Sequence, residues 1–443
     1  MLLEYSLYAG CFFSVINIIS FGFFYSYICS YYHIKNPNIN YEKFMICTFF
    51  ANIGFVLGNL MLQKSIAKIG LLRSQLLGGF LYLFNGVTIS LGSSMIYAYA
   101  SFTLVGFANQ FTLLPILMQI NRKMGKQANY YTTIILSFAG VGMMIWTSVL
   151  RWIVNPDNIK LPVHLDGSPS YFPIEIARRI AIYFSLNGLS AFIFSLLIYF
   201  NIEEAKNKST HTAEELAQFE SESNKMVFSF EFLIIMIIGV IRHSPLFYLN
   251  NNGKVIGLLI DNDDKLINNL FSFTMVFNVI GRLCAGLLWQ KFGFFFCFAL
   301  ILCLDLVIDV SMMTMPVIGV YSTMLVIHRF NIGQALVYNN LFVFSIYGTE
   351  RAIHIFKYFD TNLIMSLALV SLVNSIFGNS NFQYVNFVFI IGEVTGLFLL
   401  TKYLKDYRPL ESLNLTKILV THKEEMIDQK NTDDNHHPSP RLL

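Results

Sequence analysis

Arg282 is a charged residue in a stretch of the sequence that otherwise suits lipid. It stands within Phe277-Asn-Val-Ile-Gly-Arg-Leu-Cys-Ala-Gly-Leu-Leu-Trp-Gln-Lys-Phe-Gly293, and helical rise puts it roughly 14 Å from the turn that ends this stretch. Because the hydrocarbon core is about 30 Å thick, the guanidinium lies near its middle. A charge there costs several kcal/mol unless it faces a partner, water or a ligand. Arg282 is therefore a candidate ligand for an anion; a structural arginine bonded to backbone or to a carboxylate is the alternative.

The other ionisable side chains of the apolar segments are concentrated in the second half of the chain: Glu231, Arg242, His243, Asp305, Asp309, His328, Arg329 and Glu393. The first-half segments offer amides instead: Asn17, Asn85, Asn109, Gln110 and Gln119. Basic side chains that converge on a water-filled cavity would bind an anion. We therefore predict that Arg282 binds the substrate, with Arg329 as a second ligand or gate. Asn278 is the expected hydrogen-bonding neighbour, and Arg242 is a further candidate.

Two of these arginines have structural alternatives. Arg329 could pair with Glu350 or Asp305 rather than with a substrate. Arg242, which we place near the outer end of its helix, could extend to the membrane interface.

The candidates for proton coupling are His328, His243, Asp305 and Glu393. An unperturbed histidine titrates close to neutral pH, although a buried histidine that donates to a carbonyl is the alternative. Asp305 shares a helical face with Asp309, four residues later. The two aspartates could instead pair with an arginine or face the protein interior. The role of Glu393 stays open.

The composition is that of a polytopic membrane protein. Of the 443 residues, 55% are hydrophobic and 13% are charged, whereas a soluble protein carries about 25% charged residues. Apolar segments long enough to cross a bilayer fall at 7–31, 43–64, 71–91, 94–119, 128–154, 176–200, 227–250, 266–289, 294–314, 316–346, 354–377 and 383–404. We therefore predict an all-α fold of twelve transmembrane helices.

The domain organisation follows from where the polar stretches fall. We predict a six-helix bundle over 1–200, a cytosolic linker over 201–225, a second six-helix bundle over 226–405 and a cytosolic, disordered tail over 406–443. Lysine and arginine are concentrated in the loops on the side of the linker, which places both termini in the cytosol. The sequence leaves open whether the membrane is the plasma membrane or that of an organelle.

A repeat at half-chain distance links the two predicted bundles. Gln63-x-x-x-Ala67-Lys68-x-Gly70 aligns with Gly286-x-x-x-Gln290-Lys291-x-Gly293, and the same offset places Gly58 on Gly281. Repeats of this kind are typical of duplicated transporters. We interpret Lys68, Gly70, Lys291 and Gly293 as turns that latch the two bundles as they rock, and not as substrate ligands.

Soluble-enzyme signatures are missing from the sequence. It contains no GxxxxGK[ST], HExxH or GxSxG motif and no paired CxxC. The six cysteines have no metal-ligand spacing. We therefore expect no enzymatic activity, no cofactor, no metal and no nucleic-acid partner. The expected partners are the lipid bilayer, a small-molecule substrate of anionic character and a coupling proton.

At these residues the chain resembles a known family. The paired Lys-x-Gly turns are similar to the Gly-x-x-x-Asp-Arg-x-Gly loop of the major facilitator superfamily, with Ala67 and Gln290 in place of the acid and lysine in place of arginine. The segments Tyr248–Ile256 and Asn278–Gly286 resemble the nodulin-like members and the monocarboxylate and oxalate–formate porter branch. Ser345-Ile-Tyr-Gly-Thr349 resembles a turn that these proteins place after their tenth helix.

The resemblance implies an alternating-access carrier of a small organic anion in two pseudo-symmetric bundles. It also implies that Arg282 matches the helix-eight arginine that binds the carboxylate. Two departures stand out: Asn278 replaces the proton-carrying aspartate of the monocarboxylate porters, and the lysine of oxalate–formate exchangers is missing near Leu363, Ile364 and Met365.

The sequence thus predicts a transporter of a monocarboxylate-like metabolite, either facilitative or secondary active. A carrier of a neutral or cationic solute, such as an amino acid, nucleoside or drug, is the first alternative. A non-transporting metabolite sensor with a carrier-like fold is the second. An integral-membrane enzyme would need a clustered metal or nucleophile site that the sequence does not offer.

Overall fold

The computed structural model describes residues 2–15, 21–39, 41–124, 127–157, 159, 171–204, 221, 227–261, 264–315, 317–359, 361–377 and 382–405, and these residues form twelve helices. Seven of the helices are long and apolar enough to cross a membrane. The predicted linker falls outside this part of the chain except for 201–204 and 221. The predicted tail falls outside it entirely.

The first half supplies seven of these helices. They are α1 (Leu2–Ser14), α2 (Phe21–Lys35), α3 (Tyr41–Ile69), α4 (Leu71–Leu91), α5 (Met95–Met124), α6 (Ala128–Val154) and α7 (Ile174–Asn201). The bounds of α4 and α6 are those that the sequence predicts. The predicted span 7–31 overlaps α1 and α2, and residues 16–20 of this span fall outside the described part of the chain.

The second half supplies α9 (Phe230–Ile260), α10 (Asp264–Thr314), α11 (Ile318–Phe359), α12 (Thr361–Phe377) and α13 (Phe382–Tyr403). α10 contains both predicted spans 266–289 and 294–314, separated by Gly293, whose φ of 74° and ψ of −177° interrupt the helix. α11 continues to Phe359, so the predicted break after 346 and the turn at Ser345–Thr349 are wrong. A single glycine, Gly348, does not end a helix whose neighbours favour it.

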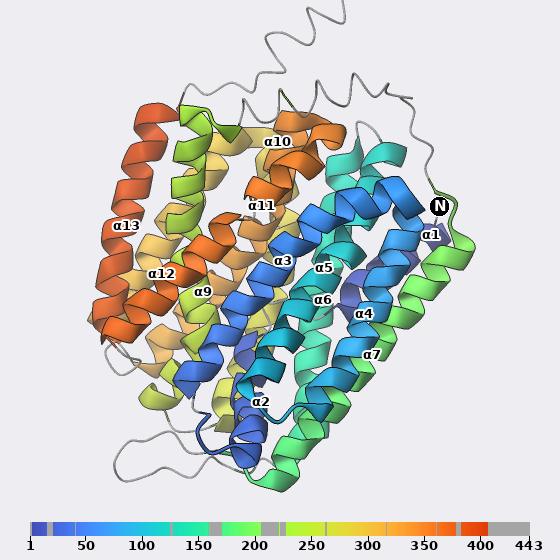
Figure 1. Cartoon of the computed structure of the whole chain (residues 1–443). Helices are drawn as coiled ribbons and strands as arrows, with labels where there is room; N and C mark the ends of the chain where they lie inside the picture. The colour runs from blue at the N-terminus through green and yellow to red at the C-terminus, as the bar shows by residue number, and fades with distance from the viewer. Residues whose placement is uncertain are drawn as a thin grey trace, which may run out of the picture.

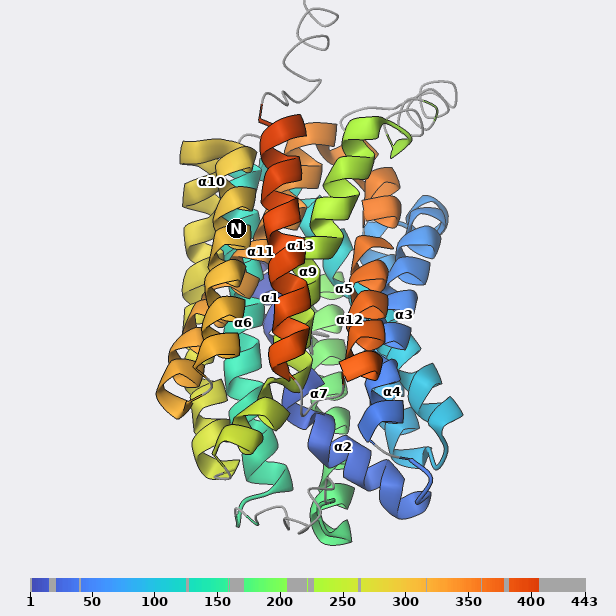
Figure 2. The ribbon, with the colours of Figure 1, turned by 90° about the vertical axis from the view of Figure 1, so that its left-hand side faces the viewer.

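The helices form two groups that stand side by side (Figures 1 and 2). Within the first group, α3 packs on α5, and α4 packs on α5 and α7. Within the second, α10 packs on α11 and α13, and α9 packs on α12 and α13. The groups meet where α6 packs on α10, α3 on α12 and α2 on α9. With α1 and α2 counted as one segment and α10 as two, each group holds six segments, as the sequence predicts.

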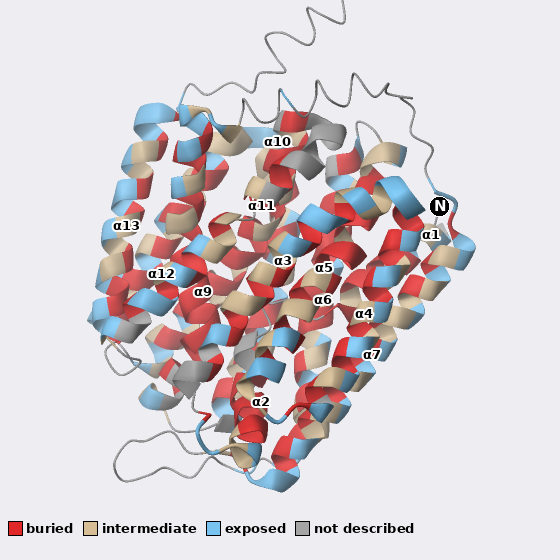
Figure 3. Ribbon diagram, viewed as in Figure 1, coloured by how far each residue is buried: buried red, intermediate tan, exposed pale blue. Residues whose placement is uncertain are grey.

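The helices have exposed residues on their outward faces and buried residues on their inward faces (Figure 3). Large hydrophobic side chains such as Trp152, Phe200 and Phe398 are 76%, 74% and 60% exposed. Polar and charged residues lie inside instead: Arg242, Arg282 and Arg329 are among the largest fully buried side chains. Apolar side chains on the outside and polar side chains in the interior are typical of a protein surrounded by lipid. The protein is a multi-pass integral membrane protein.

The half-chain repeat has a structural counterpart in how the helices touch. A Cβ on Gly58 of α3 would lie 3.1 Å from the carbonyl oxygen of Phe107 in α5. A Cβ on Gly281 of α10, its partner in the repeat, would lie 2.2 Å from the carbonyl oxygen of Phe330 in α11. In both groups the repeated glycine therefore lets two backbones approach closely.

The two Lys-x-Gly turns also match in conformation. Gly70 (φ 91°) and Gly293 (φ 74°) are the glycines with positive φ among the described residues. This region of φ and ψ is adopted almost only by glycine. Gly70 lies between α3 and α4, and Gly293 interrupts α10.

Candidate functional site

A cavity of about 110 Å³ lies between the two helix groups. Its first-half wall comes from α1, α3, α5 and α6, and includes Phe12, Phe55, Asn109, Gln110, Leu136 and Ala139. Its second-half wall comes from α10, α11 and α12, and includes Arg282, Leu336, Asn339, Asn340, Phe356 and Leu363. Small-molecule sites are usually apolar hollows with a few convergent polar groups. This cavity is therefore the candidate site.

Arg282 is the charged residue of this lining. Its Nε donates to Oδ1 of Asn278 at 2.9 Å, and its Nη1 donates to the carbonyl oxygen of Leu136 at 2.6 Å. Leu136 belongs to α6, so the guanidinium bridges the two helix groups. Its Nη2 has no hydrogen-bond partner among the described residues, and the side chain is only 1% exposed. A buried donor without a partner is costly, and a ligand in the cavity would satisfy it.

The backbone around Arg282 is held in place by close contact with α11. Asn278 lies one helical turn earlier and donates from Nδ2 to the carbonyl oxygen of Arg329 at 3.2 Å. This bond directs its Oδ1 toward Arg282. A Cβ on Gly333 would lie 2.3 Å from the carbonyl oxygen of Asn278, so the two helices touch at this level. The structure therefore brings Arg282 and Asn278 together, as the sequence predicts.

Amide side chains supply the rest of the polar lining. Asn109 and Gln110 come from α5, and Oδ1 of Asn109 has no hydrogen-bond partner among the described residues. Asn339 and Asn340 come from α11, and Asn340 donates to the carbonyl oxygen of Leu336 at 2.9 Å. The sequence analysis missed Asn339 and Asn340, although two adjacent amides in an apolar segment could have indicated a polar cavity wall.

Arg242 does not line the cavity but contacts a residue that does. Its Nη2 donates to Oδ1 of Asn339, and its guanidinium lies 4.4 Å from the ring centre of Phe298. Arg242 is the thirteenth residue of α9, a helix of 31 residues, and it is fully buried. The interpretation that it lies near the outer end and extends to the interface was therefore wrong.

His243 shares this contact network. Its Nδ1 lies 2.7 Å from the carbonyl oxygen of Gly239, to which it must donate. Its Nε2 lies 3.0 Å from Nδ2 of Asn339 and 3.2 Å from Nη2 of Arg242, both of which are donors. These contacts fit the neutral ring, with Nε2 as an acceptor. They match the alternative in which the histidine is structural.

Arg329 lies inside the second helix group, apart from the cavity lining. Its Nη1 donates to Oδ1 of Asn250 in α9 at 2.5 Å, and its guanidinium lies 5.1 Å from the ring centre of Phe271. Oδ1 of Asp305 accepts from Asn331 at 2.6 Å, and its Oδ2 has no hydrogen-bond partner among the described residues, so the predicted pairing of Arg329 with Asp305 is not found there. The side chain of Glu350 falls outside the described residues. His328 is 1% exposed, and its Nε2 has no partner in the described part of the chain.

Three carboxyl groups gather between α10 and α13. Asp305 and Asp309 lie on one face of α10, and Glu393 comes from α13; they are 2%, 5% and 0% exposed. Asp309 and Glu393 lie within hydrogen-bonding reach of each other. Asp305 is close enough to Arg242 for the two charges to interact, although no hydrogen bond joins them among the described residues. None of the three lines the cavity.

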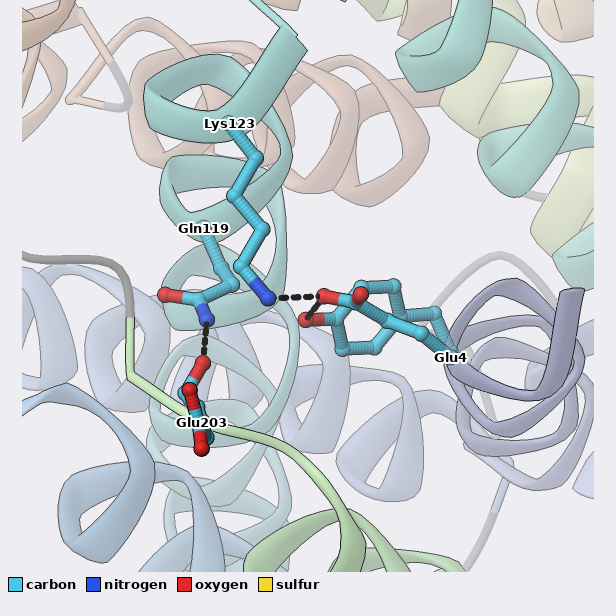
Figure 4. A network of polar contacts seen from close by, with 5 residues as sticks. Glu4, Gln119, Lys123 and Glu203 are labelled. Carbon is cyan, nitrogen blue, oxygen red and sulfur yellow. Dashed lines mark hydrogen bonds and ion pairs between the residues drawn. The ribbon is translucent and has the colours of Figure 1, made fainter. Parts of the chain in front are cut away.

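Polar contacts near the start of α1 connect elements of the first helix group (Figure 4). Lys123 forms an ion pair with Glu4 at 2.5 Å, and Gln119 donates to the carbonyl oxygen of Glu203 at 2.7 Å. Glu204 accepts from the backbone N–H groups of Leu71 and Leu72 at 2.9 and 3.3 Å. This acid caps the start of α4, and the sequence analysis, which assigned 201–225 to a linker, did not find it.

The predicted gating turns lie at the surface. Lys68 and Lys291 are exposed beside Gly70 and Gly293. Neither lysine lines the cavity.

No family model matches the chain, and no curated protein matches it in sequence. Its structure is similar to the crystal structure of the nucleoside transporter NupG, with a TM-score of 0.64 and 12% identity over 92% of this chain and 100% of that one. It is also similar to a D-xylose–proton symporter (TM-score 0.63, 12% identity, 94% and 99% of the two chains). FucP, a major facilitator superfamily transporter in the outward conformation, gives a TM-score of 0.62 at 12% identity over 90% of this chain and 97% of that one.

The chain has the major facilitator fold. In this fold the cavity with Arg282 lies between the two six-helix bundles, and Arg282 and Leu136 join them across it. At these identities the likeness establishes the fold and not the substrate.

Proposed function

We propose that the protein carries a small organic anion across a membrane by alternating access between its two bundles. The observation that carries the proposal is Arg282: a guanidinium in the wall of the cavity between the bundles, with Nη2 unpaired among the described residues. Carboxylates bind guanidinium groups through charge-assisted hydrogen bonds, which are stronger than neutral ones. A monocarboxylate-like metabolite is the substrate class that we favour, as in the porters that the sequence resembles.

The contacts of Arg282 suggest how binding is linked to rocking of the bundles. Nη1 spans from α10 in the second bundle to the carbonyl oxygen of Leu136 in the first. A carboxylate bound in bidentate fashion to both Nη1 and Nη2 would displace that carbonyl from Nη1, because the charged oxygen is the stronger acceptor. Loading and release of the anion would therefore make and break a contact between the bundles.

Arg242 contributes to the site indirectly, through its hydrogen bond to Asn339 in the cavity wall. The cation touches an amide in the cavity wall and keeps its Oδ1 occupied, so that the amide is held in one orientation. Arg329 would act through Asn278, whose Nδ2 its backbone carbonyl accepts. We therefore propose both arginines as positioning residues, and Arg282 and Asn278 as the pair at the substrate.

A neutral polar solute is the second candidate substrate. Amide side chains of Asn109, Gln110, Asn339 and Asn340 line the cavity from both bundles, and such groups suit hydroxyl and amide ligands. The titles of the similar structures name a nucleoside transporter and a D-xylose–proton symporter. In this case Arg282 would be structural.

Both termini and the Lys68 and Lys291 turns would lie on the cytosolic side, as the distribution of basic residues predicts. The two turns would then latch the bundles during rocking. Reaction of an engineered cysteine at position 68 with a membrane-impermeant reagent, in intact and in permeabilised cells, tests this orientation.

Counterflow in proteoliposomes separates the two substrate classes. Purified full-length protein would be loaded with an unlabelled solute, and entry of the same labelled solute would be followed for lactate, pyruvate, adenosine, xylose and an amino acid. The proposal expects exchange of the carboxylates. Exchange of the neutral solutes without the carboxylates would contradict it.

A further inference from the structure

We propose that Asp309 and Glu393 share a bound proton within the second bundle, at a site apart from the cavity, and that this is the proton coupled to transport. The coupling part rests on the proposed function, whereas the proton site itself does not.

The contact between the two carboxyl groups carries the inference. Asp309 in α10 and Glu393 in α13 are 5% and 0% exposed and lie within hydrogen-bonding reach of each other. Neither oxygen of Glu393 has an N–H or O–H donor among the described residues, and Oδ2 of Asp309 has none either. Two carboxylates are both acceptors. They can form a hydrogen bond only when a proton lies between them.

The hydroxyl of Tyr248 is a second buried group close to the two carboxyl groups. The phenol of Tyr248 in α9 is 2% exposed, its hydroxyl has no partner among the described residues, and it lies near Asp309. Its ring also packs on Phe389, one turn before Glu393 in α13. A phenol can donate to a carboxylate or accept from a carboxylic acid. Tyr248 therefore gives the site a group that can stay bonded whether or not the proton is present.

Proton binding fits this site better than metal binding. The described residues place no three His, Cys, Asp or Glu side chains so that they could hold a metal ion. A proton needs only the two facing oxygens.

The charged and titratable groups around the pair come from α9 and α10. Arg242 of α9 faces Asp305, and Asp305 and Cys303 of α10 lie near Glu393. Asp305 also accepts from Asn331 of α11. Arg242 donates to Asn339, and Asn339 lines the cavity. The charge of the carboxyl cluster therefore reaches the cavity wall through Asp305, Arg242 and Asn339.

Infrared spectroscopy tests the proton site without any substrate. The full-length protein in lipid would be titrated with acid and base, and the C=O stretch of protonated carboxyl groups would be followed. We expect a band in the wild type that shifts in Asp309→Asn and in Glu393→Gln, because each exchange replaces one partner of the shared hydrogen bond. The double variant should lose this band.

Glu231→Gln is the matched control, because Glu231 is an exposed carboxyl at the start of α9. It should leave the band unchanged. Lack of such a band in the wild type, or a double variant that keeps it, would overturn the proton site. The single exchanges preserve shape, and gel filtration with circular dichroism would identify a variant that does not fold. If one variant does not fold, the test rests on comparing the wild-type band with the band of the single variant that does fold.

Transport then tests the coupling. With labelled lactate as the probe, one unit of pH difference should drive about tenfold accumulation for one proton per anion, because a pH unit corresponds to 1.36 kcal/mol. The double variant should exchange lactate but accumulate none. Normal accumulation in this variant would overturn the coupling. If the wild type does not carry lactate or any other carboxylate, the proposed function fails, while the infrared result stands by itself.

Discussion

The two bundles share their architecture but differ in the chemistry of their interiors. Inside the first, neutral groups bond to one another: Gln75 donates to Ser195 at 2.9 Å, and Ser14 and Ser190 lie 2.6 Å apart. Inside the second, the corresponding space holds arginines and carboxyl groups, with Arg242 and Asp305 as one example. The two halves therefore share their helix packing, whereas among the described residues buried charge is confined to the second half.

The residues related by the repeat make this difference specific. Gly58 and Gly281 both allow close backbone contact. The next residue in each half is Asn59 in the first and Arg282 in the second. A polar amide thus takes the place that the cation has in the other bundle. We infer that the first bundle contributes a wall and the second the charge that selects the substrate.

The largest expected effect comes from removing that charge. Arg282→Ala should lower carboxylate uptake by about 30- to 150-fold, because a hydrogen bond to a charged group contributes roughly 2–3 kcal/mol. Asn59→Ala, the exchange at the repeat-related position, should lower it by less than about threefold. Uptake into proteoliposomes at matched protein content measures both. Equal losses would show that the two bundles do not differ in this way.

The next effect concerns stability. Arg242→Leu should lower the free energy of unfolding by about 2 kcal/mol, because it leaves Oδ1 of Asn339 without its charged donor. Gln75→Leu in the first bundle should cost about 1 kcal/mol, the value of one neutral hydrogen bond. Melting temperatures in detergent would rank the two variants. A Gln75→Leu protein that melts at the lower temperature would contradict the comparison.

The paired glycine turns give a smaller and matched test. Gly70→Ala and Gly293→Ala both introduce a side chain at positive φ, which costs roughly 1–3 kcal/mol. At Gly70 the new Cβ would also lie 3.0 Å from Oε2 of Glu204, which caps α4, whereas at Gly293 nothing lies within 4 Å. Gly70→Ala should therefore melt at a lower temperature than Gly293→Ala. The reverse order would show that the Glu204 cap contributes little.

The smallest effect is expected at the ion pair between Lys123 and Glu4 (Figure 4). Both side chains are partly exposed, at 27% and 18%. Exposed pairs contribute less than about 1 kcal/mol, so Glu4→Gln should change the melting temperature only slightly and leave uptake unchanged. A loss of uptake in Glu4→Gln would instead give this end of the first bundle a part in gating.

Much of the fold could be predicted because lipid imposes long apolar helices. The bounds of α4 and α6 follow directly from apolar runs that end at glycine and polar residues. The failure lies at α11, which continues past the predicted end of its apolar run at 346 to Phe359.

The candidate site was harder to predict, because hydropathy does not tell which way a side chain points. Arg282 and Asn278 are one turn apart on a single helix, so their proximity follows from sequence alone. Arg242 and Arg329 are equally buried, yet they point toward Asn339 and Asn250, and only the packing of α9 against α11 decides this. Glu204 could not be found, because its partner N–H groups are more than 130 residues away.

The most direct test of an anion site at Arg282 compares a carboxylate with its own neutral amide. Counterflow of labelled lactate would be competed with unlabelled lactate and with lactamide, in the wild type and in Arg282→Gln. We predict that lactate competes at least about tenfold better than lactamide in the wild type and that Arg282→Gln removes this preference. A wild type that treats the two alike, or an Arg282→Gln protein that still prefers lactate, would contradict the account.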